Sequence, residues 1–128
     1  MAPRSTIFLW ASIFWTLLIT LVCLCTYSDV PKVSISNIDK LVHISLHFIF
    51  VLLWYLFFES QKKERKINLK IKVFLGSLLF GILIEILQGV FTKTRSADLF
   101  DVFANAIGAF SALLMITLFE KLLIKETN

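Results

Sequence analysis

Charged residues are scarce in this chain of 128 residues: Lys, Arg, Asp and Glu make up 17% of it, whereas 58% is hydrophobic. Soluble domains average about a quarter charged and about half apolar residues, so the mean hydropathy of +0.84 is unusually high. The composition therefore predicts an integral membrane protein. At this length we expect a single domain, residues 1–128, with no room for a separate soluble catalytic domain.

Cysteine and catalytic motifs are also nearly absent. The two cysteines, Cys23 and Cys25, lie two positions apart on one expected helix, where their side chains point to different faces and cannot readily form a disulfide. The sequence has no zinc-ligand spacing, no glycine-rich phosphate loop and no GxSxG motif. These absences argue against zinc modules, phosphate-loop proteins and hydrolases of the GxSxG type, and no cofactor is expected.

Long apolar runs are what the chain does contain. They cover residues 7–27, 41–58, 73–91 and 99–119. A helix crosses a hydrocarbon core about 30 Å thick with roughly 20 apolar residues. The first run is too long for a signal peptide, whose apolar region has about 7–15 residues, and no small-x-small cleavage site follows it. We therefore predict an all-α integral membrane protein, a four-transmembrane-helix bundle.

Positive charge is unevenly distributed between the two sides of this bundle. Nine Lys and Arg residues, most of them in residues 62–72, fall on the side of the two termini, and four fall on the other side. By the positive-inside rule, both termini and the 59–72 loop are predicted to face the cytoplasm. The net charge of +4 therefore indicates membrane topology, and no nucleic-acid partner is expected.

The remaining polar side chains gather at one depth, at the outward ends of the second, third and fourth runs. Asp98, Asp101 and Asn105 share one helical face, because residues three and four positions apart lie on the same side of a helix. Asp39 and His43 share a face of the second run in the same way. We expect these faces to converge in one outward-facing pocket. The predicted ligand-binding residues are Asp39, Lys40, His43, Glu85, Gln88, Arg95, Asp98, Asp101 and Asn105.

Small residues accompany the polar ones. The fourth run carries the series Ala104, Gly108 and Ala112. Such small-xxx-small faces let membrane helices approach closely. In the third run Gly81 and Gly89 flank Glu85 at intervals of four residues, which places Glu85 on a glycine face. Both patterns predict that the polar faces point into the bundle.

Three polar motifs resemble those of the VanZ-like family, small membrane proteins named for a protein associated with teicoplanin resistance. The motifs are DKLVH at 39–43, EILQ at 85–88 and RSADLFDVFANAIG at 95–108. The resemblance spans about residues 39–112 and departs at Ala112, where many relatives carry glycine. It implies a multi-pass protein of the bacterial cytoplasmic membrane with a role in envelope or antibiotic-resistance physiology. It does not supply a reaction.

Several of these residues also have a structural interpretation. Asp98 and Asp101 lie in the first turns of a helix, where a carboxylate offsets unpaired amides by about 0.3–1 kcal/mol. Lys40 and Arg95 can extend to the membrane interface. Glu85 is harder to explain in this way, because an acid several residues inside an apolar span requires a partner or a proton. Its expected partners are His43, Arg95 and Lys40.

Three classes of function fit this pattern. The first is binding of the head group of a lipid or lipid-linked envelope precursor, with the basic side chains on phosphate. The second is an enzyme acting on such a substrate, with His43 and either Asp39 or Glu85 as its acid and base. The third is a structural or interaction subunit, bound to a membrane protein or a second copy, whose polar cluster only fixes helix packing. We favour the first class.

A divalent cation is compatible with each of these classes. Hard cations favour carboxylate oxygens, and the acids within reach are Asp39, Glu85, Asp98 and Asp101. Lys40 and Arg95 compete for the same acids, however, so the sequence assigns no metal site.

Overall fold

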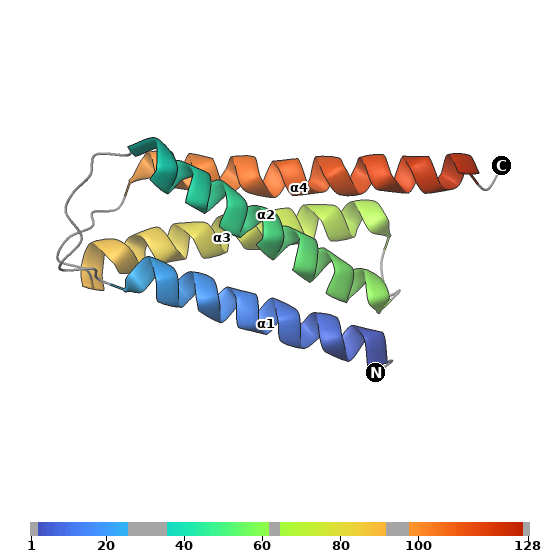
Figure 1. Cartoon of the computed structure of the whole chain (residues 1–128), viewed down its shortest axis with the longest axis horizontal. Helices are drawn as coiled ribbons and strands as arrows, with labels where there is room; N and C mark the ends of the chain where they lie inside the picture. Colours follow the sequence, from blue (N-terminus) through green and yellow to red (C-terminus); the bar gives the residue numbers. More distant parts are fainter. Residues whose placement is uncertain (1–2, 26–35, 62–64, 92–97, 127–128) are drawn as a thin grey trace.

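The computed structural model describes residues 3–25, 36–61, 65–91 and 98–126. Across these ranges the chain forms four helices and no strand (Figure 1). The helices are α1 (Pro3–Leu24), α2 (Ser36–Ser60), α3 (Lys66–Phe91) and α4 (Leu99–Glu126). Each is long and apolar enough to cross a membrane. The predicted fold class, an all-α membrane protein with four transmembrane helices, is therefore confirmed.

The helices extend beyond most of the apolar runs from which they were predicted. α1 begins at Pro3 rather than at residue 7, and α3 begins at Lys66 rather than at residue 73. Lys and Arg are good helix formers whose long side chains reach the interface, so a helix can continue past the hydrocarbon. The apolar run therefore indicates which residues lie in the hydrocarbon core, but it does not indicate where the helix begins or ends. α1 ends at Leu24, and the last residues of its predicted run, 26–27, lie outside the described residues.

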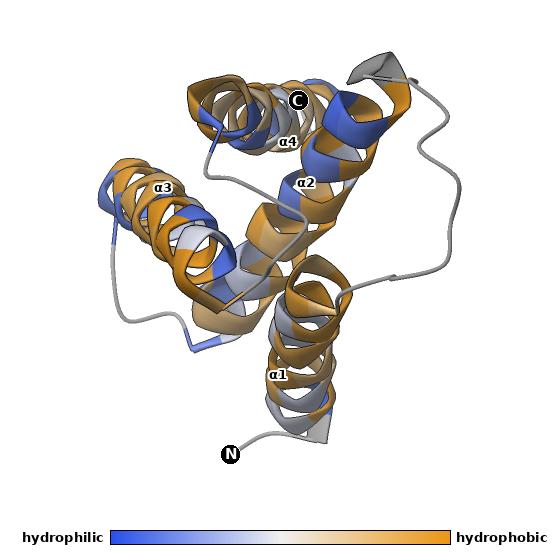
Figure 2. Cartoon of the chain, turned by 90° about the vertical axis from the view of Figure 1, so that its left-hand side faces the viewer, coloured by the Kyte–Doolittle hydropathy of each residue, from blue (hydrophilic) through white to orange (hydrophobic). Residues whose placement is uncertain are grey.

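Successive helices run in opposite directions, which gives the bundle two distinct ends (Figure 1). At the first end, here called the site end, α1 and α3 finish and α2 and α4 begin. The second, here called the termini end, carries both chain termini. α2 contacts each of the other helices, whereas the described parts of α1 and α4 do not contact one another. Figure 2 accordingly shows α1 and α4 on opposite sides of α2 and α3.

The exterior of the bundle is apolar, and polar side chains lie inside it. Leu79, Val90 and Phe110 are 69%, 70% and 61% exposed. This surface suits hydrocarbon. Figure 2 shows that most residues along the four helices are hydrophobic. The buried polar residues are Ser5, Ser12, His43, His47, Ser77, Glu85, Gln88, Asp101 and Asn105. The interior is therefore more polar than the surface in contact with lipid.

α2 and α4 approach most closely at Gly108. A Cβ atom added to Gly108 would overlap the backbone carbonyl of Ile44 in α2. Ala104 and Ala112, one turn on either side, are 3% and 0% exposed. The predicted small-residue face of the fourth span therefore does lie against another helix. This close approach brings the polar residues of α4 within reach of those of α2.

The inward face of α3 is less glycine-rich than the sequence predicted. Gly81 is buried, and a Cβ there would lie 2.9 Å from Asn105 Nδ2 and 3.1 Å from His47 Cε1. Gly89 is exposed, so its placement on the same face was wrong. At about 100° per residue, a four-residue repeat drifts around the helix, and by its second step it has left the face of Gly81. Gln88, rather than Gly89, continues that face.

Tryptophan side chains join α1 to α2. Trp15 Nε1 donates a hydrogen bond to the backbone carbonyl of Leu46 at 3.0 Å, and Trp54 Nε1 donates to Thr16 Oγ1 at 3.2 Å. Each bond joins α1 to α2, and neither involves a residue of α4. They hold α1 against the bundle and leave the site to α2, α3 and α4.

Candidate ligand-binding site

His43 is the centre of the polar site. It is 2% exposed and lies near the beginning of α2. Its Nδ1 is 3.1 Å from Asn105 Oδ1 of α4 and 3.9 Å from Glu85 Oε1 of α3. Its Nε2 is 3.8 Å from Asp101 Oδ2 of α4. Three helices therefore place polar side chains around one imidazole, and we refer to His43, Glu85, Asp101 and Asn105 as the His43 cluster.

The orientation of the Asn105 amide, whose oxygen faces His43 Nδ1, assigns the roles in this hydrogen bond. An amide oxygen can only accept a hydrogen bond, so Nδ1 must be the donor. In the neutral ring Nε2 then has a free lone pair. That lone pair lies on the side of Asp101, whose oxygen is too far away for a hydrogen bond.

Glu85 connects α3 to the beginning of α4. It is 3% exposed, and its Oε2 accepts a hydrogen bond from the backbone N–H of Asp98 at 3.2 Å. A helix N-terminus carries a partial positive charge, so this carboxylate is placed where it is stabilised. The sequence did not indicate this contact, because it joins residues on two separate helices.

Asp98 serves as the N-cap of α4. Its Oδ1 accepts a hydrogen bond from the backbone N–H of Phe100 at 2.8 Å, and its carbonyl accepts one from the N–H of Asp101 at 3.1 Å. Capping of this kind is typically worth about 0.5–2 kcal/mol. Helix capping is therefore enough to explain why an acid stands at position 98. Asp101 differs, because its side chain makes no such capping bond within the described part of the chain.

Some hydrogen-bonding atoms of the His43 cluster have no partner among the described residues. Within the described ranges, Glu85 Oε1, Asp101 Oδ1 and Asn105 Nδ2 are buried and have no hydrogen-bond partner. A buried polar group without a partner costs about 1–3 kcal/mol, and nearly all such groups in native proteins are paired. Two acceptors and one donor therefore lie at one place with hydrogen-bonding groups that the described side chains leave unused.

Asp39 and Lys40 lie at the rim of this cluster and are half-buried. Lys40 Nζ is 5.7 Å from the centre of the Phe100 ring, a cation–π distance. Asp39 supplies a carboxylate close to His43 and Asp101. Arg95, the other predicted basic residue, lies outside the described residues.

Gln88 and His47 are buried but make other contacts. Gln88 Nε2 donates to the carbonyl of Cys23 at 2.8 Å, which ties α3 to α1. His47 Nδ1 is 2.8 Å from Ser77 Oγ, and its ring lies beside Phe50 and Phe80. These contacts give both residues a role in helix packing. The prediction that Gln88 also binds a ligand stays a prediction.

A second polar cluster lies near the termini end and was not predicted. Glu120 of α4 accepts hydrogen bonds from Tyr55 Oη at 2.5 Å and from Lys70 Nζ at 2.7 Å, and Lys66 Nζ lies 3.3 Å from it. These contacts join α2, α3 and α4. The sequence signal was an acid at the end of an apolar run, which also fits a residue facing the interface. Because its groups are paired with one another, this cluster is best explained as a set of interhelical contacts that stabilises the packing of α2, α3 and α4.

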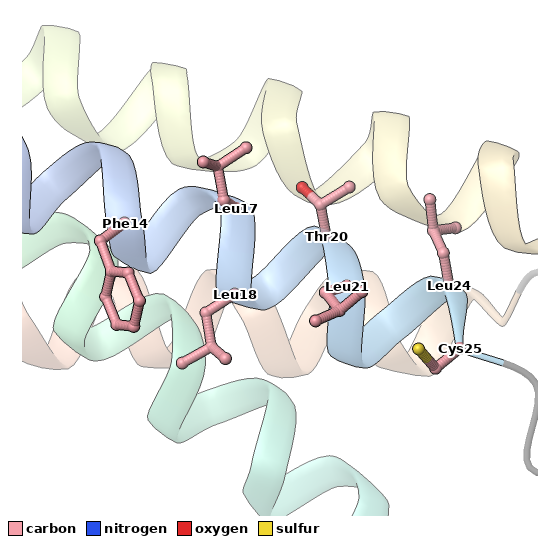
Figure 3. A pocket seen from close by; sticks show the side chains of 7 residues that line it. All are labelled: Phe14, Leu17, Leu18, Thr20, Leu21, Leu24 and Cys25. Carbon is pink, nitrogen blue, oxygen red and sulfur yellow. The ribbon is translucent and has the colours of Figure 1, made fainter.

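An apolar groove runs along α1 toward the site end (Figure 3). Its volume is about 580 Å³. Its lining residues are Phe14, Leu17, Leu18, Thr20, Leu21, Leu24 and Cys25. With so few polar groups, the groove suits a hydrocarbon chain and not a head group.

Four spanning helices around a buried polar cluster define the class: a multi-pass membrane protein with a polar site inside its bundle. The sequence model of the VanZ/LLP1 family matches residues 5–120. The chain belongs to this family, which confirms the predicted family resemblance. No curated protein and no solved structure matches the chain.

Proposed function

We propose that the chain binds the head group of a membrane lipid or of a lipid-linked envelope precursor at the His43 cluster. The observation that carries this proposal is that three atoms of this cluster are buried and have no hydrogen-bond partner among the described residues: Glu85 Oε1, Asp101 Oδ1 and Asn105 Nδ2. A head group that offers donors to the two acids and an acceptor to the amide would complete all three.

The charges at the rim favour a head group that contains phosphate. Lys40 lies there, and Arg95, the other basic residue predicted from the sequence, is outside the described residues. Basic side chains recognise phosphate through charge-assisted hydrogen bonds, while Glu85 and Asp101 suit a hydroxyl or amine on the same head group. The ligand class is therefore an amphiphile with a zwitterionic or sugar-bearing phosphate head.

We further propose that the site end faces away from the cytoplasm in a bacterial cytoplasmic membrane, because the excess of Lys and Arg lies at the termini end. Cysteine labelling tests this orientation in a chain with Cys23→Ser and Cys25→Ser. Arg65→Cys, at the termini end, should react with an impermeant thiol reagent only after the cells are permeabilised. Leu99→Cys, at the site end, should react in intact cells. The reverse pattern would refute the orientation.

An enzyme acting on the same ligand is the second candidate. The observation that favours it is His43 itself, a buried imidazole bonded to Asn105 and lying 3.9 Å from the carboxylate of Glu85 and 3.8 Å from that of Asp101, which is an arrangement suited to acid–base chemistry. Incubating the purified protein with the lipid that it retains distinguishes the two functions. Binding alone leaves the lipid intact, whereas an enzyme releases or exchanges its head group, and His43→Gln stops the reaction.

Mass spectrometry of co-purified lipid tests the proposed function. In the wild-type protein, purified in mild detergent, we expect one lipid class to be enriched over its share of the membrane by about tenfold or more, which corresponds to about 1.4 kcal/mol of selectivity. Lys125→Ala, at the termini end, should retain the same lipid. Lipids that simply match the membrane composition in both samples would instead support a structural role for the cluster.

A further inference from the structure

We infer that Asp39, His43 and Asp101 form a binding site for a divalent transition-metal ion of the Zn²⁺ class. Each residue offers one ligand atom, and these atoms all lie within 4.8 Å of one another. The site overlaps the proposed head-group site, but it does not depend on it, since an ion can be held with or without a lipid.

The orientation of His43 is the main support for a metal. Its Nδ1 donates to Asn105, which leaves the lone pair of Nε2 near Asp101 Oδ2, at 3.8 Å. Metal-binding histidines are oriented in this way, with the second nitrogen donating to an acceptor from the surrounding residues. Two atoms that each lie about 2.1 Å from one ion can be up to about 4.2 Å apart. An ion therefore fits between Nε2 and the carboxylate, where a direct hydrogen bond does not.

The second support is the unpaired carboxylate oxygen of Asp101. Asp101 is 7% exposed, and its Oδ1 has no hydrogen-bond partner among the described residues. Glu85 adds another buried acid on the opposite side of the imidazole. Buried acids of this kind are paired or coordinate metals in most proteins. A divalent cation at this site would neutralise the carboxylates of both Asp39 and Asp101.

The donor set selects the class of ion. Calcium takes 6–8 oxygen ligands, and magnesium retains most of its waters, so neither suits one imidazole and two carboxylates. Nitrogen and oxygen donors together suit Zn²⁺, and catalytic zinc sites with three protein ligands keep a fourth position open. That position could take water or a phosphate oxygen.

Zinc titration of the purified full-length chain tests this inference. The protein carries Cys25→Ser, because this exposed cysteine could bind zinc by itself. It is stripped with a chelator, titrated with ZnCl₂ and assayed for bound metal by mass spectrometry. We expect about one Zn²⁺ per chain, with affinity lowered about tenfold or more in His43→Gln and in Asp39→Asn. Asp39 is half-buried, so its variant should fold even where the histidine variant does not.

Glu59→Gln is the matched control, an acid at the termini end that should leave zinc affinity unchanged. Zinc binding that both site variants retain would overturn the inference, as would displacement of Zn²⁺ by equimolar Ca²⁺ or Mg²⁺. Lipid retention is measured on the same chelated samples. If the protein retains a selected lipid but does not bind zinc, only the metal site is rejected. If it binds zinc but retains no selected lipid, only the head-group proposal is rejected.

Discussion

Asp101→Asn should remove most of the co-purified lipid and leave the thermal stability of the protein nearly unchanged. The substitution keeps the shape of the side chain and removes its negative charge. The structure gives the carboxylate no hydrogen bond to lose: Oδ1 is unpartnered among the described residues, and Oδ2 is 3.8 Å from His43 Nε2. A charge-assisted hydrogen bond to a ligand is worth about 1.5–3 kcal/mol, so lipid retention should fall by about tenfold or more.

Asp98→Asn is the matched comparison for this prediction. Because the Asp98 side chain caps α4, we expect this variant to retain lipid and to change stability by about 1 kcal/mol or less, since Asn is also a good cap. Lipid analysis and thermal unfolding in detergent measure both effects. If Asp101→Asn retains the lipid, or loses it only by failing to accumulate in the membrane, the cluster is a packing element and not a binding site.

Gly108→Leu should have the largest effect on folding. A side chain at this position would overlap the Ile44 carbonyl, and a backbone atom cannot move aside as a flexible side chain can. α2 and α4 would have to separate along their whole contact. Overpacking typically costs about 1–3 kcal/mol, and we expect a loss at or above the top of this range because the obstacle is backbone. The variant should accumulate poorly and unfold at a lower temperature than the wild type.

Gly76→Leu provides the control, because a Cβ at Gly76 meets no atom within 4 Å and the residue is exposed. Replacing an exposed helical glycine by leucine gains up to about 1 kcal/mol of helix propensity, so stability should be unchanged or slightly raised. Size-exclusion profiles and melting temperatures compare the two variants. Equal stability would mean that the close contact between α2 and α4 does not exist in the membrane.

The sequence predicted the helices and the polar faces, because both depend on local information. Apolar length indicates a span, and spacing by three or four residues identifies a face, as it did for Asp101 and Asn105. The small-residue series around Gly108 also predicted the inward side of α4 correctly. These patterns require no knowledge of which helices are neighbours.

The sequence could not predict contacts that depend on the neighbours of each helix. Gln88 was predicted to join the pocket, yet the contact described for it here reaches α1, and Glu120 bonds to Tyr55 and Lys70 although it ends an apolar run. In a membrane, lipid tails are as apolar as leucine, so the apolar pattern does not identify the buried side of a helix. Pairing of helices is decided by close packing and hydrogen bonds, which single-sequence periodicity does not encode.

An experimental structure of the protein purified with its native lipids is the most direct test of the proposed site. We predict head-group density between α2, α3 and α4, with polar atoms within about 3.5 Å of Glu85 Oε1, Asp101 Oδ1 and Asn105 Nδ2. Density for lipid tails on the exterior alone, with these three atoms paired to side chains of the protein itself, would contradict it.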